Sequence, residues 1–317
     1  MELKSFEERK KFIDKLHVTR HNFQDISLIK YNSPINDDMA IGIAIFNPAN
    51  SKRIIMNYLY MIEKIKLAKI PYYVIELVFE NKTPEISEAY HVYTDKYGFY
   101  KEQLFRLLEK KIPSKYTKLC FLDADLIFLN TDWYNETSEL LDAFNIVHPY
   151  KNCFDIDLTF TKFSSRMRLS LTLLGGSLNF DRFHSGFGFA FQREWYNQIG
   201  FFDYAILGAG DVVSSFKFLN LGECPYVNIY YNSNYYKQFD KKFIDNPSIS
   251  FTDGTVYHLF HGPKLSRQYG SRFDILPKKH KIEEYLSENE NNLTEFKDYQ
   301  INQLVKKYFL MRSDDLF

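Results

Sequence analysis

The stretch KLCFLDADLIFL, residues 118–129, decides the fold predicted for this chain. A mostly apolar run leads into Asp123-Ala124-Asp125, and four more apolar residues follow. Such a run predicts a strand covered on both faces, as in a parallel sheet. In open α/β sheets the ligand crevice lies beyond the carboxyl ends of the strands, which is where the two acids would stand.

A strand–helix–strand unit is predicted upstream of this stretch. Residues 39–46 (MAIGIAIF) and 72–79 (YYVIELVF) are almost wholly apolar and predict buried strands. Residues 51–68 between them predict a helix with one apolar face. That face is expected to consist of Ile55, Leu59, Ile62 and Ile65. A unit of this kind is typical of parallel sheets with helices on their faces.

The rest of the chain fits the same class. Helices are predicted at 101–111, at 212–219 and near Arg193, and strands at 91–93, 185–191 and 254–260. We therefore expect an α/β protein with a mostly parallel central sheet flanked by helices.

One domain with two appendages is the predicted organisation. Residues 39–280 form the domain, residues 1–38 are an N-terminal extension packed on it, and residues 281–317 are a charged helical tail. Residues 151–183 look less regular, with Gly175-Gly176 at a hinge-like spot, and are expected to be a mobile segment over a site.

Composition excludes several classes of protein. The 317 residues include 40 Lys and Arg and 40 Asp and Glu, which argues against a chain whose main task is to bind nucleic acid. Cys120, Cys153 and Cys224 are widely spaced and form no CxxC, so neither a disulfide framework nor a zinc knuckle is predicted. No apolar run of about 18 residues predicts a transmembrane helix.

The expected location is the cytoplasm. The charged residues 1–10 lack the apolar core of a signal peptide, and the cysteine usage fits a reducing compartment. Tyr and Phe are frequent together with Lys, Asn and Ile, as in proteins of AT-rich genomes. The sequence does not indicate an oligomeric state.

Asp123 and Asp125 are the first candidate for chemistry. A turn at Ala124 would bring both carboxylates to one side, where they could hold Mg²⁺ or Mn²⁺ against a diphosphate. The alternative is a solvated strand end with Asp as a turn former. The apolar residues on both sides favour the functional interpretation, because isolated acids are costly in such a run.

The second candidate is Gly208-Ala209-Gly210-Asp211, ahead of a predicted helix. Glycines allow tight turns and close approach to a ligand, so Asp211 would stand at the helix start facing the pocket. The alternative is an ordinary helix N-cap.

The third candidate is VYHLFHGPK, residues 256–264, with basic residues after it. His258 or His261 could supply one imidazole to a metal that also has carboxylate ligands. Cations for phosphate groups would come from Lys264, Arg267 and Arg272. The alternative for each histidine is a structural, hydrogen-bonded residue.

Two further charged positions are singled out. Glu76 lies inside an apolar strand, where it could accept a hydrogen bond from a nucleotide base or form a strand-edge ion pair. Lys101-Glu102 begin the helix ahead of the 118–129 stretch, and the alternative to a functional role is an exposed helix start.

These motifs, taken in order, resemble the GT-A glycosyltransferases, and most closely small enzymes of that fold from large DNA viruses, phages and bacteria. The similarity covers about residues 40–276. It rests on residues 46–48 with Arg53, Asn57 and Tyr58, on 74–77, Lys101, Glu102 and Leu104, on 121–125 with Trp133, on 184–190, on 206–211, and on 258–262 with Arg267, Tyr269 and Arg272. The chain departs from the family pattern at Phe99, Arg106, Phe189 and Phe260, where that pattern has Trp, Asn, Trp and Trp.

The resemblance implies a GT-A domain at residues 39–280 and roles for individual residues. Asp125 would bind Mn²⁺ or Mg²⁺ directly, and Asp123 would contact the metal through water or the donor ribose. His261, or alternatively His258, would complete the metal shell. Asp211 matches the base of inverting enzymes.

The resemblance also implies the substrates. The donor would be a nucleotide sugar, with a UDP-sugar favoured, and the acceptor a glycan or glycoprotein. Donor contacts would come from Asn47, Arg53, Glu76, Lys101, Asp123, Lys264 and Arg267. Acceptor contacts would come from His184, Gly186 and Gly210. A viral source is the expectation from composition and resemblance together.

Two other functions compete with this one. A sugar-nucleotidyltransferase would show a Gly-rich N-terminal phosphate loop, which NPAN at 47–50 is not. A catalytically inactive glycan-binding module on the same fold would have no need of intact acids at 123, 125 and 211 and an intact His261, so the presence of Asp123, Asp125 and Asp211 argues against it.

Overall fold

The computed structural model describes residues 21–80, 82–173, 182–267, 270–276, 281–312 and 314–315. The predictions made for Gly175-Gly176, for Tyr269 and for the side chain of Lys264 lie outside what is described.

A seven-stranded sheet forms the centre of the molecule. Its strands, in spatial order, are β11 (Ile249–Phe251), β6 (Ile146–His148), β10 (Gly188–Gln192), β4 (Lys118–Leu122), β1 (Met39–Phe46), β2 (Tyr72–Phe79) and β3 (Tyr90–Thr94). β1 pairs in parallel with β2 and β4, β2 with β3, and β6 with β11, whereas β10 runs antiparallel to both of its neighbours. The predicted α/β class with a mostly parallel sheet is confirmed.

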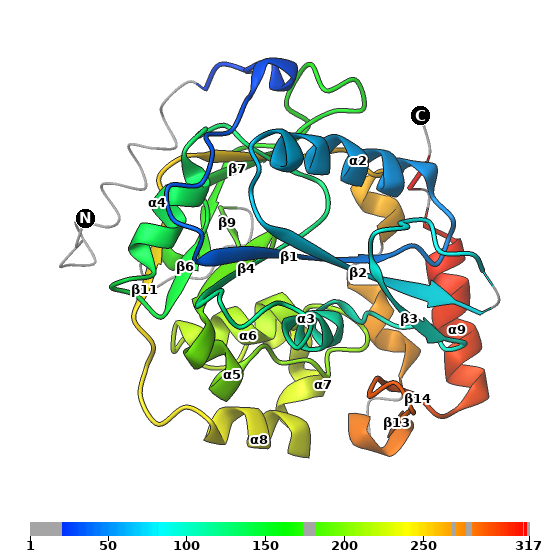
Figure 1. The fold of residues 1–317 in the computed structure, drawn as a ribbon. Coiled ribbons are helices and arrows are strands. Elements are labelled where there is room, and N and C mark those ends of the chain that lie inside the picture. The colour runs from blue at the N-terminus through cyan, green and yellow to red at the C-terminus, as the bar shows by residue number, and fades with distance from the viewer. Residues whose placement is uncertain are drawn as a thin grey trace.

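Helices cover both faces of this sheet (Figure 1). α2 (Lys52–Leu67) lies on one face, and α3 (Lys101–Glu109), α5 (Arg193–Ile199) and α6 (Gly210–Phe218) lie on the other. α2 begins where the Ser51 hydroxyl accepts a hydrogen bond from the backbone N–H of Ile54. Its buried apolar residues are Tyr58, Met61, Ile62 and Ile65. The expectation that Leu59 faces inward is wrong: its side chain is 53% exposed, because the buried face is centred on Tyr58 and Met61.

A second sheet lies beside the first. Its order is β5 (Leu126–Phe128), β12 (Thr255–His258), β7 (Asn152–Asp155), β8 (Arg168–Ser170) and β9 (Phe183–His184). The expectation of an irregular segment at 151–183 is wrong for residues 152–155 and 168–173, whereas its mobility stays a prediction. These residues form β7, β8 and the 3-10 helix η2 (Leu171–Leu173), because β7 pairs with β12 and β8 pairs with β7 and β9, which stabilises strands too short and mixed to show a pattern.

Shorter elements complete the fold. They are the 3-10 helices η1 (Ile26–Leu28), η3 (Pro225–Val227), η4 (Lys264–Arg267), η5 (Ser271–Ile275) and η6 (Ile282–Tyr285), and the helices α4 (Trp133–Leu140), α7 (Asn228–Tyr231) and α8 (Asn234–Lys241). No helix in the described part of the chain is both long and apolar enough to cross a membrane.

The described parts of both end segments, residues 21–38 and 281–315 without 313, pack against the rest of the protein. Phe23 stacks on Tyr257 of β12, and the Tyr31 hydroxyl accepts a hydrogen bond from the Phe128 backbone. The tail contains a helix, α9 (Tyr299–Leu310), as expected, but a hairpin of β13 (Leu286–Glu288) and β14 (Thr294–Phe296) precedes it. Phe309 of α9 packs on Phe99, which brings the tail to the side of the sheet where β1 and β4 end.

Gly42 permits the close packing of β1 against the core. A Cβ at this position would lie 2.5 Å from Cδ1 of Phe121 and 3.3 Å from Cδ2 of Leu108. Neither the Phe121 ring nor the Leu108 isobutyl group can move freely, because both side chains are fully buried in the hydrophobic core.

We expect Gly42→Ala to lower the free energy of unfolding by about 1–3 kcal/mol, the usual cost of overpacking a core. Urea denaturation measures the change. Gly270→Ala is the matched control, because nothing lies within 4 Å of a Cβ built there. Equal losses in the two variants would contradict the packing explanation.

Candidate active site

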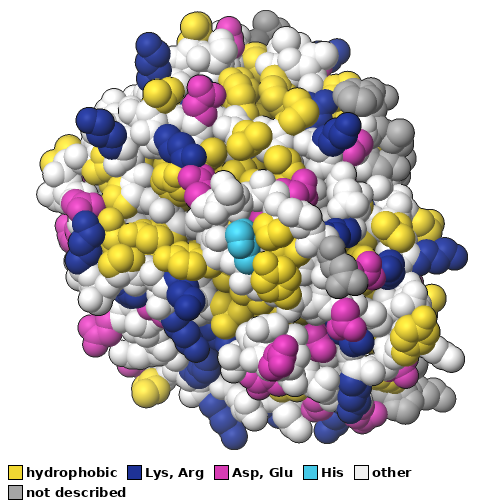
Figure 2. Space-filling model, turned by 45° about the vertical axis from the view of Figure 1, so that its right-hand side comes forward, with side chains coloured by type: hydrophobic (Ala, Val, Ile, Leu, Met, Phe, Trp, Pro, Cys, Tyr) yellow, Lys and Arg dark blue, Asp and Glu magenta, His cyan; other side chains and the backbone are white. Residues whose placement is uncertain are grey.

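A cavity of about 920 Å³ opens at the carboxyl ends of β1 and β4. Its wall includes the 123–125 segment after β4, the first turns of α3 and α6, the end of β12 and Phe309 of α9. Figure 2 shows one face of the molecule, where hydrophobic side chains surround a histidine and basic and acidic side chains are interspersed.

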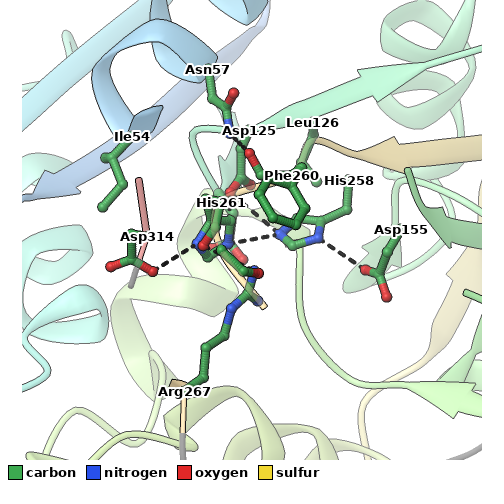
Figure 3. A network of polar contacts seen from close by, with 12 residues as sticks. Ile54, Asn57, Asp125, Leu126, Asp155, His258, Phe260, His261, Arg267 and Asp314 are labelled. Carbon is green, nitrogen blue, oxygen red and sulfur yellow. Dashed lines mark hydrogen bonds and ion pairs between the residues drawn. The ribbon is translucent and has the colours of Figure 1, made fainter. Parts of the chain in front are cut away.

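Asp125, His258 and His261 form a compact cluster in this cavity (Figure 3). The Nε2 atoms of both histidines lie 3.3 Å from Oδ2 of Asp125 and 3.2 Å from each other. One ligand atom from each residue falls within 4.8 Å of the others. Both imidazoles therefore present the same nitrogen to the carboxylate.

Strand pairing explains how residues so far apart in sequence meet. β5, which begins one residue after Asp125, runs antiparallel to β12, with Leu126 opposite His258. The backbone N–H of Leu259 donates to the carbonyl of Asp125 at 2.9 Å. His261 follows within three residues of the strand end, so the register of two short strands fixes the whole cluster.

The cluster fits a divalent metal ion. Oδ1 of Asp125 is buried and has no hydrogen-bond partner among the described residues, so a lone pair is left for a ligand. One carboxylate oxygen and two imidazole nitrogens are a donor set that suits Mn²⁺ or Zn²⁺. The sequence predicted Asp125 and one of the two histidines here, and the structure brings both histidines to it.

The carboxylate of Asp123 is paired with Lys101 and is not part of the Asp125–His258–His261 cluster. Its Oδ1 accepts a hydrogen bond from Nζ of Lys101 at 3.0 Å. Burial raises the pKa of Asp123, an effect that Lys101 opposes. The proposed contact of Asp123 with a metal or a ribose stays a prediction.

Charges inside the cluster are strongly coupled. Burial favours the neutral form of Asp125, but His258 and then His261 outweigh it and lower its pKa to about 2. Burial favours neutral His258 too, yet Asp125 and Asp155 raise its pKa to about 9. Burial and Arg267 lower the pKa of His261 to about 4. At neutral pH the metal-free cluster therefore holds an ionised Asp125, a protonated His258 and a neutral His261.

Asp211 lines the same cavity as this cluster, and its charge interacts with Lys101 and Asp123. It lies in the first turn of α6, after Gly208 and Ala209, which both have positive φ angles. Its Oδ2 packs so closely on Gly186 that no Cβ would fit there. Burial lowers the pKa of Lys101, but Asp123 and Asp211 outweigh it and raise the pKa above the ordinary value.

Glu102 is a buried acid, so the alternative of an exposed helix start is wrong for this residue. It is 4% exposed and lines the cavity, and a Cβ at Gly210 would lie 2.5 Å from its carboxyl carbon. Burial, with a smaller contribution from Asp211, raises its pKa to about 7. Gly210 is therefore needed for close packing of the Asp211 turn on α3.

The predicted nucleotide contacts have structural partners. Asn47 bonds the backbone of Ser51, accepting from its N–H and donating to its carbonyl. The Glu76 carboxylate accepts the backbone N–H groups of Glu85 and Ile86, at 2.8 and 3.0 Å. Neither residue is in the wall of the cavity, so burial of Glu76 needs no nucleotide to explain it.

Arg53 also lies outside the cavity wall. Its guanidinium lies 5.9 Å from the centre of the Phe160 ring, and its backbone N–H donates to Asp315 at the start of α2. A role for Arg53, Asn47 or Glu76 in donor binding stays a prediction.

The predicted cations after β12 do reach the cavity. Arg267 is 7% exposed and donates weakly to the carbonyls of His261 and Gly262, at 3.4 Å each. The Arg272 guanidinium packs against Gly208 and lies 5.0 Å from the centre of the Phe99 ring. Both line the same cavity as the metal cluster.

The predicted acceptor residues gather around Asp211. His184 lines the cavity, stacks on Phe187 with ring centres 3.8 Å apart, and accepts the Gly186 N–H at Nδ1. Burial lowers the pKa of His184 well below its ordinary value, so the ring is neutral.

Four charged residues of the cavity wall were not singled out in the sequence. They are Asp155, Arg168, Arg312 and Asp314. Asp155 ends β7, a strand of four residues, and Asp314 follows α9, so neither stands in a recognisable motif. The one feature of the sequence that could have indicated Asp155 is its place directly after the apolar pair Cys153-Phe154.

Comparisons with known proteins leave the family open. No protein-family model and no curated protein sequence matches the chain. Three solved structures illustrate the similar folds. The catalytic domain of Drosophila β1,4-galactosyltransferase 7 with xylobiose is 12% identical over 57% of this chain, with a TM-score of 0.33. This chain spans only 59% of that galactosyltransferase chain.

The other two are sugar–phosphoglycerate synthases. The glucosyl-3-phosphoglycerate synthase of Mycobacterium tuberculosis is 13% identical, covering 82% of this chain and 80% of its own, with a TM-score of 0.37. The mannosyl-3-phosphoglycerate synthase of Rubrobacter xylanophilus is 8% identical, covering 96% and 99%, with a TM-score of 0.40. Likenesses this distant carry no argument about function, which must come from the residues themselves.

His258 makes the stability of the metal-free protein depend on pH. Its folded-state pKa of about 9 exceeds the ordinary 6.5, so the folded protein binds this proton more tightly than the unfolded chain. That contribution is complete below pH 6.5 and is lost as the pH rises through 9.

In EDTA, we expect the free energy of unfolding of wild type to exceed that of His258→Gln at pH 6.5. This excess should shrink by up to about 3 kcal/mol as the pH rises to 9. Urea denaturation across this range measures it. Parallel pH profiles for the two proteins would show that His258 does not carry this proton.

Proposed function

We propose that this protein is a metal-dependent transferase that moves a sugar from a nucleotide-diphosphate sugar to an acceptor hydroxyl. The observation that carries the proposal is that one cavity holds both the Asp125–His258–His261 cluster and the carboxylate of Asp211. A metal site and a separate carboxylate are what such a transfer requires: charge for the leaving diphosphate and a base for the attacking hydroxyl.

The diphosphate of the donor is proposed to lie between the Asp125–His258–His261 cluster and the basic side chains of the cavity wall. Asp125, His258 and His261 would hold the ion, and two imidazole ligands favour Mn²⁺ over Mg²⁺, which prefers oxygen. When bound, such an ion supplies positive charge that stabilises the departing diphosphate. Lys101, Arg267 and Arg272 supply further positive charge to phosphate oxygens.

Asp211 is proposed as the base. Its carboxylate takes the proton from the acceptor hydroxyl while that oxygen forms a bond to the anomeric carbon. The bond from this carbon to the diphosphate oxygen breaks in the same step, and the electron pair leaves with the nucleoside diphosphate. A single displacement of this kind inverts the anomeric centre. Lys101, whose charge interacts with both Asp123 and Asp211, adds positive charge beside the proposed base.

The apolar part of the cavity would keep water from the donor. Phe46, Phe99, Phe187, Phe273 and Phe309 line it. Excluding water matters because water competes with the acceptor for the anomeric carbon. A UDP-sugar as donor, a glycan or glycoprotein as acceptor, and action in the cytoplasm complete the proposal.

We expect the purified protein with Mn²⁺ to release nucleoside diphosphate slowly from one member of a panel of UDP-, GDP- and dTDP-sugars, without acceptor. EDTA and Asp125→Ala should abolish the release. Asp211→Asn should lower the rate by about 10²–10⁴-fold, the usual contribution of a positioned base. It should still show the rise in Tm caused by nucleoside diphosphate and Mn²⁺, since that rise reports binding alone.

Asp142→Asn is the control for these variants, because Asp142 pairs with Lys118 at the opposite end of β4 and is 66% exposed. It should behave as wild type. Absence of both release and a Tm rise with every donor would contradict the proposal. A Tm rise with glycans alone would favour an inactive binding module.

A further inference from the structure

We propose that Asp155 and Asp314 are positioning residues that orient the two histidines of the cluster toward a metal ion. Asp155 comes from β7, and Asp314 comes from the segment after α9. The inference rests on the metal site of the proposed function and adds to it two residues that are not ligands themselves.

His258 is held by Asp155. The Nδ1 atom of His258 lies 2.9 Å from Oδ1 of Asp155, on the side of the ring away from Asp125. The same oxygen accepts a hydrogen bond from Nη2 of Arg168 at 2.8 Å. β7 and β12 pair with His258 opposite Asp155, so the backbone register itself places the carboxylate behind the imidazole.

His261 has a matching partner in Asp314. Its Nδ1 has no hydrogen-bond partner among the described residues and lies 3.6 Å from Oδ1 of Asp314, which is only 4% exposed (Figure 3). Nη2 of Arg312 donates to the same carboxylate oxygen at 3.2 Å. An arginine–carboxylate–histidine arrangement therefore occurs twice, from two unrelated parts of the fold, with a hydrogen bond to the imidazole from Asp155 and a longer approach from Asp314.

The segment that carries Asp314 is anchored at the start of α2. Asp315 accepts a hydrogen bond from the Ser51 hydroxyl at 2.7 Å and from the backbone N–H groups of Lys52 and Arg53 at 3.1 and 2.9 Å. A carboxylate at a helix N-terminus satisfies N–H groups that have no partner within the helix. This anchor fixes the position of Asp314 beside His261.

The shared arrangement has a chemical consequence. A carboxylate at Nδ1 favours the imidazole form that carries its proton on that nitrogen, which leaves the lone pair of Nε2 toward the cluster. Both Nε2 atoms already face Oδ2 of Asp125. The two carboxylates thus select ring orientation and tautomer together, in the way that orients histidine ligands in metal sites generally.

We expect Asp155→Asn to weaken Mn²⁺ binding by about 10–100-fold, the usual loss when such a partner is removed. Asp314→Asn should have a smaller effect, because its distance to the imidazole is 3.6 Å rather than 2.9 Å. Isothermal titration with MnCl₂ on the full chain, free of nucleotide, measures the dissociation constants. Circular dichroism and Tm verify that each variant is folded.

A spectroscopic readout separates positioning from stability. In the Co²⁺-loaded protein, each ligand histidine gives a shifted, exchangeable Nδ1–H proton resonance, and a buried carboxylate slows its exchange with water. Asp155→Asn should speed exchange of one resonance, and Asp314→Asn of the other. Asp38→Asn, which removes a carboxylate bonded to Lys118 and Ser138 away from the cavity, should lower Tm without changing either readout.

Wild-type Mn²⁺ affinity and unchanged exchange in both variants would overturn the inference and leave the two aspartates as structural ion pairs. That result would leave the proposed function intact, provided that Asp125→Ala still abolishes Mn²⁺ binding. Wild-type protein that fails to bind Mn²⁺ through Asp125 would instead overturn the metal site and the inference with it.

Discussion

The pairing of β5 with β12 is the constraint on which the candidate site depends. The hydrogen bond from Leu259 N–H to the Asp125 carbonyl joins the segment after β4 to the end of a strand about 130 residues later. It sets the separation of Asp125 from both imidazoles, and it also places His258 beside β7. The central sheet provides the crevice, but the small second sheet supplies the second half of the cluster and the carboxylate behind it.

A strand that is buried on both faces has an apolar run long enough for the strand to be predicted from the sequence. The strands β1, β2 and β4 have the predicted bounds because they are such segments. The sequence indicated Asp123, Asp125 and Asp211 because acids or glycines interrupt an apolar context at these positions. β7 and β8 have four and three residues, and their stability comes from strand pairing, of β7 with β12 and of β8 with β7 and β9, rather than from any pattern of their own. Asp155, which depends on that pairing, could not be predicted.

Glu76 and Asn47 show a different limit of sequence reasoning. The Glu76 carboxylate was expected to meet either a nucleotide base or an ion-pair partner at the strand edge. It accepts two backbone N–H groups from the loop after β2 and lies 3.5 Å from Nε2 of His91 on the edge strand β3, which compensates its burial. Sequence can indicate that a buried polar group needs a partner, but the fold decides whether a ligand or the chain itself provides it. The same reasoning makes Oδ1 of Asp125 notable, since the described residues offer it no partner.

The anchoring of Asp315 at the start of α2 has a consequence for biosynthesis. Helix α2 and strand β1 emerge early from the ribosome, whereas the residues that cap α2 and stand behind His261 are added some 250 residues later. The nascent chain can therefore build the first strand–helix–strand unit long before its polar cavity is complete. Loss of only a few residues after α9 would remove Asp314 and Asp315 while sparing most of the hydrophobic core, so such a protein would fold and yet be defective at the site.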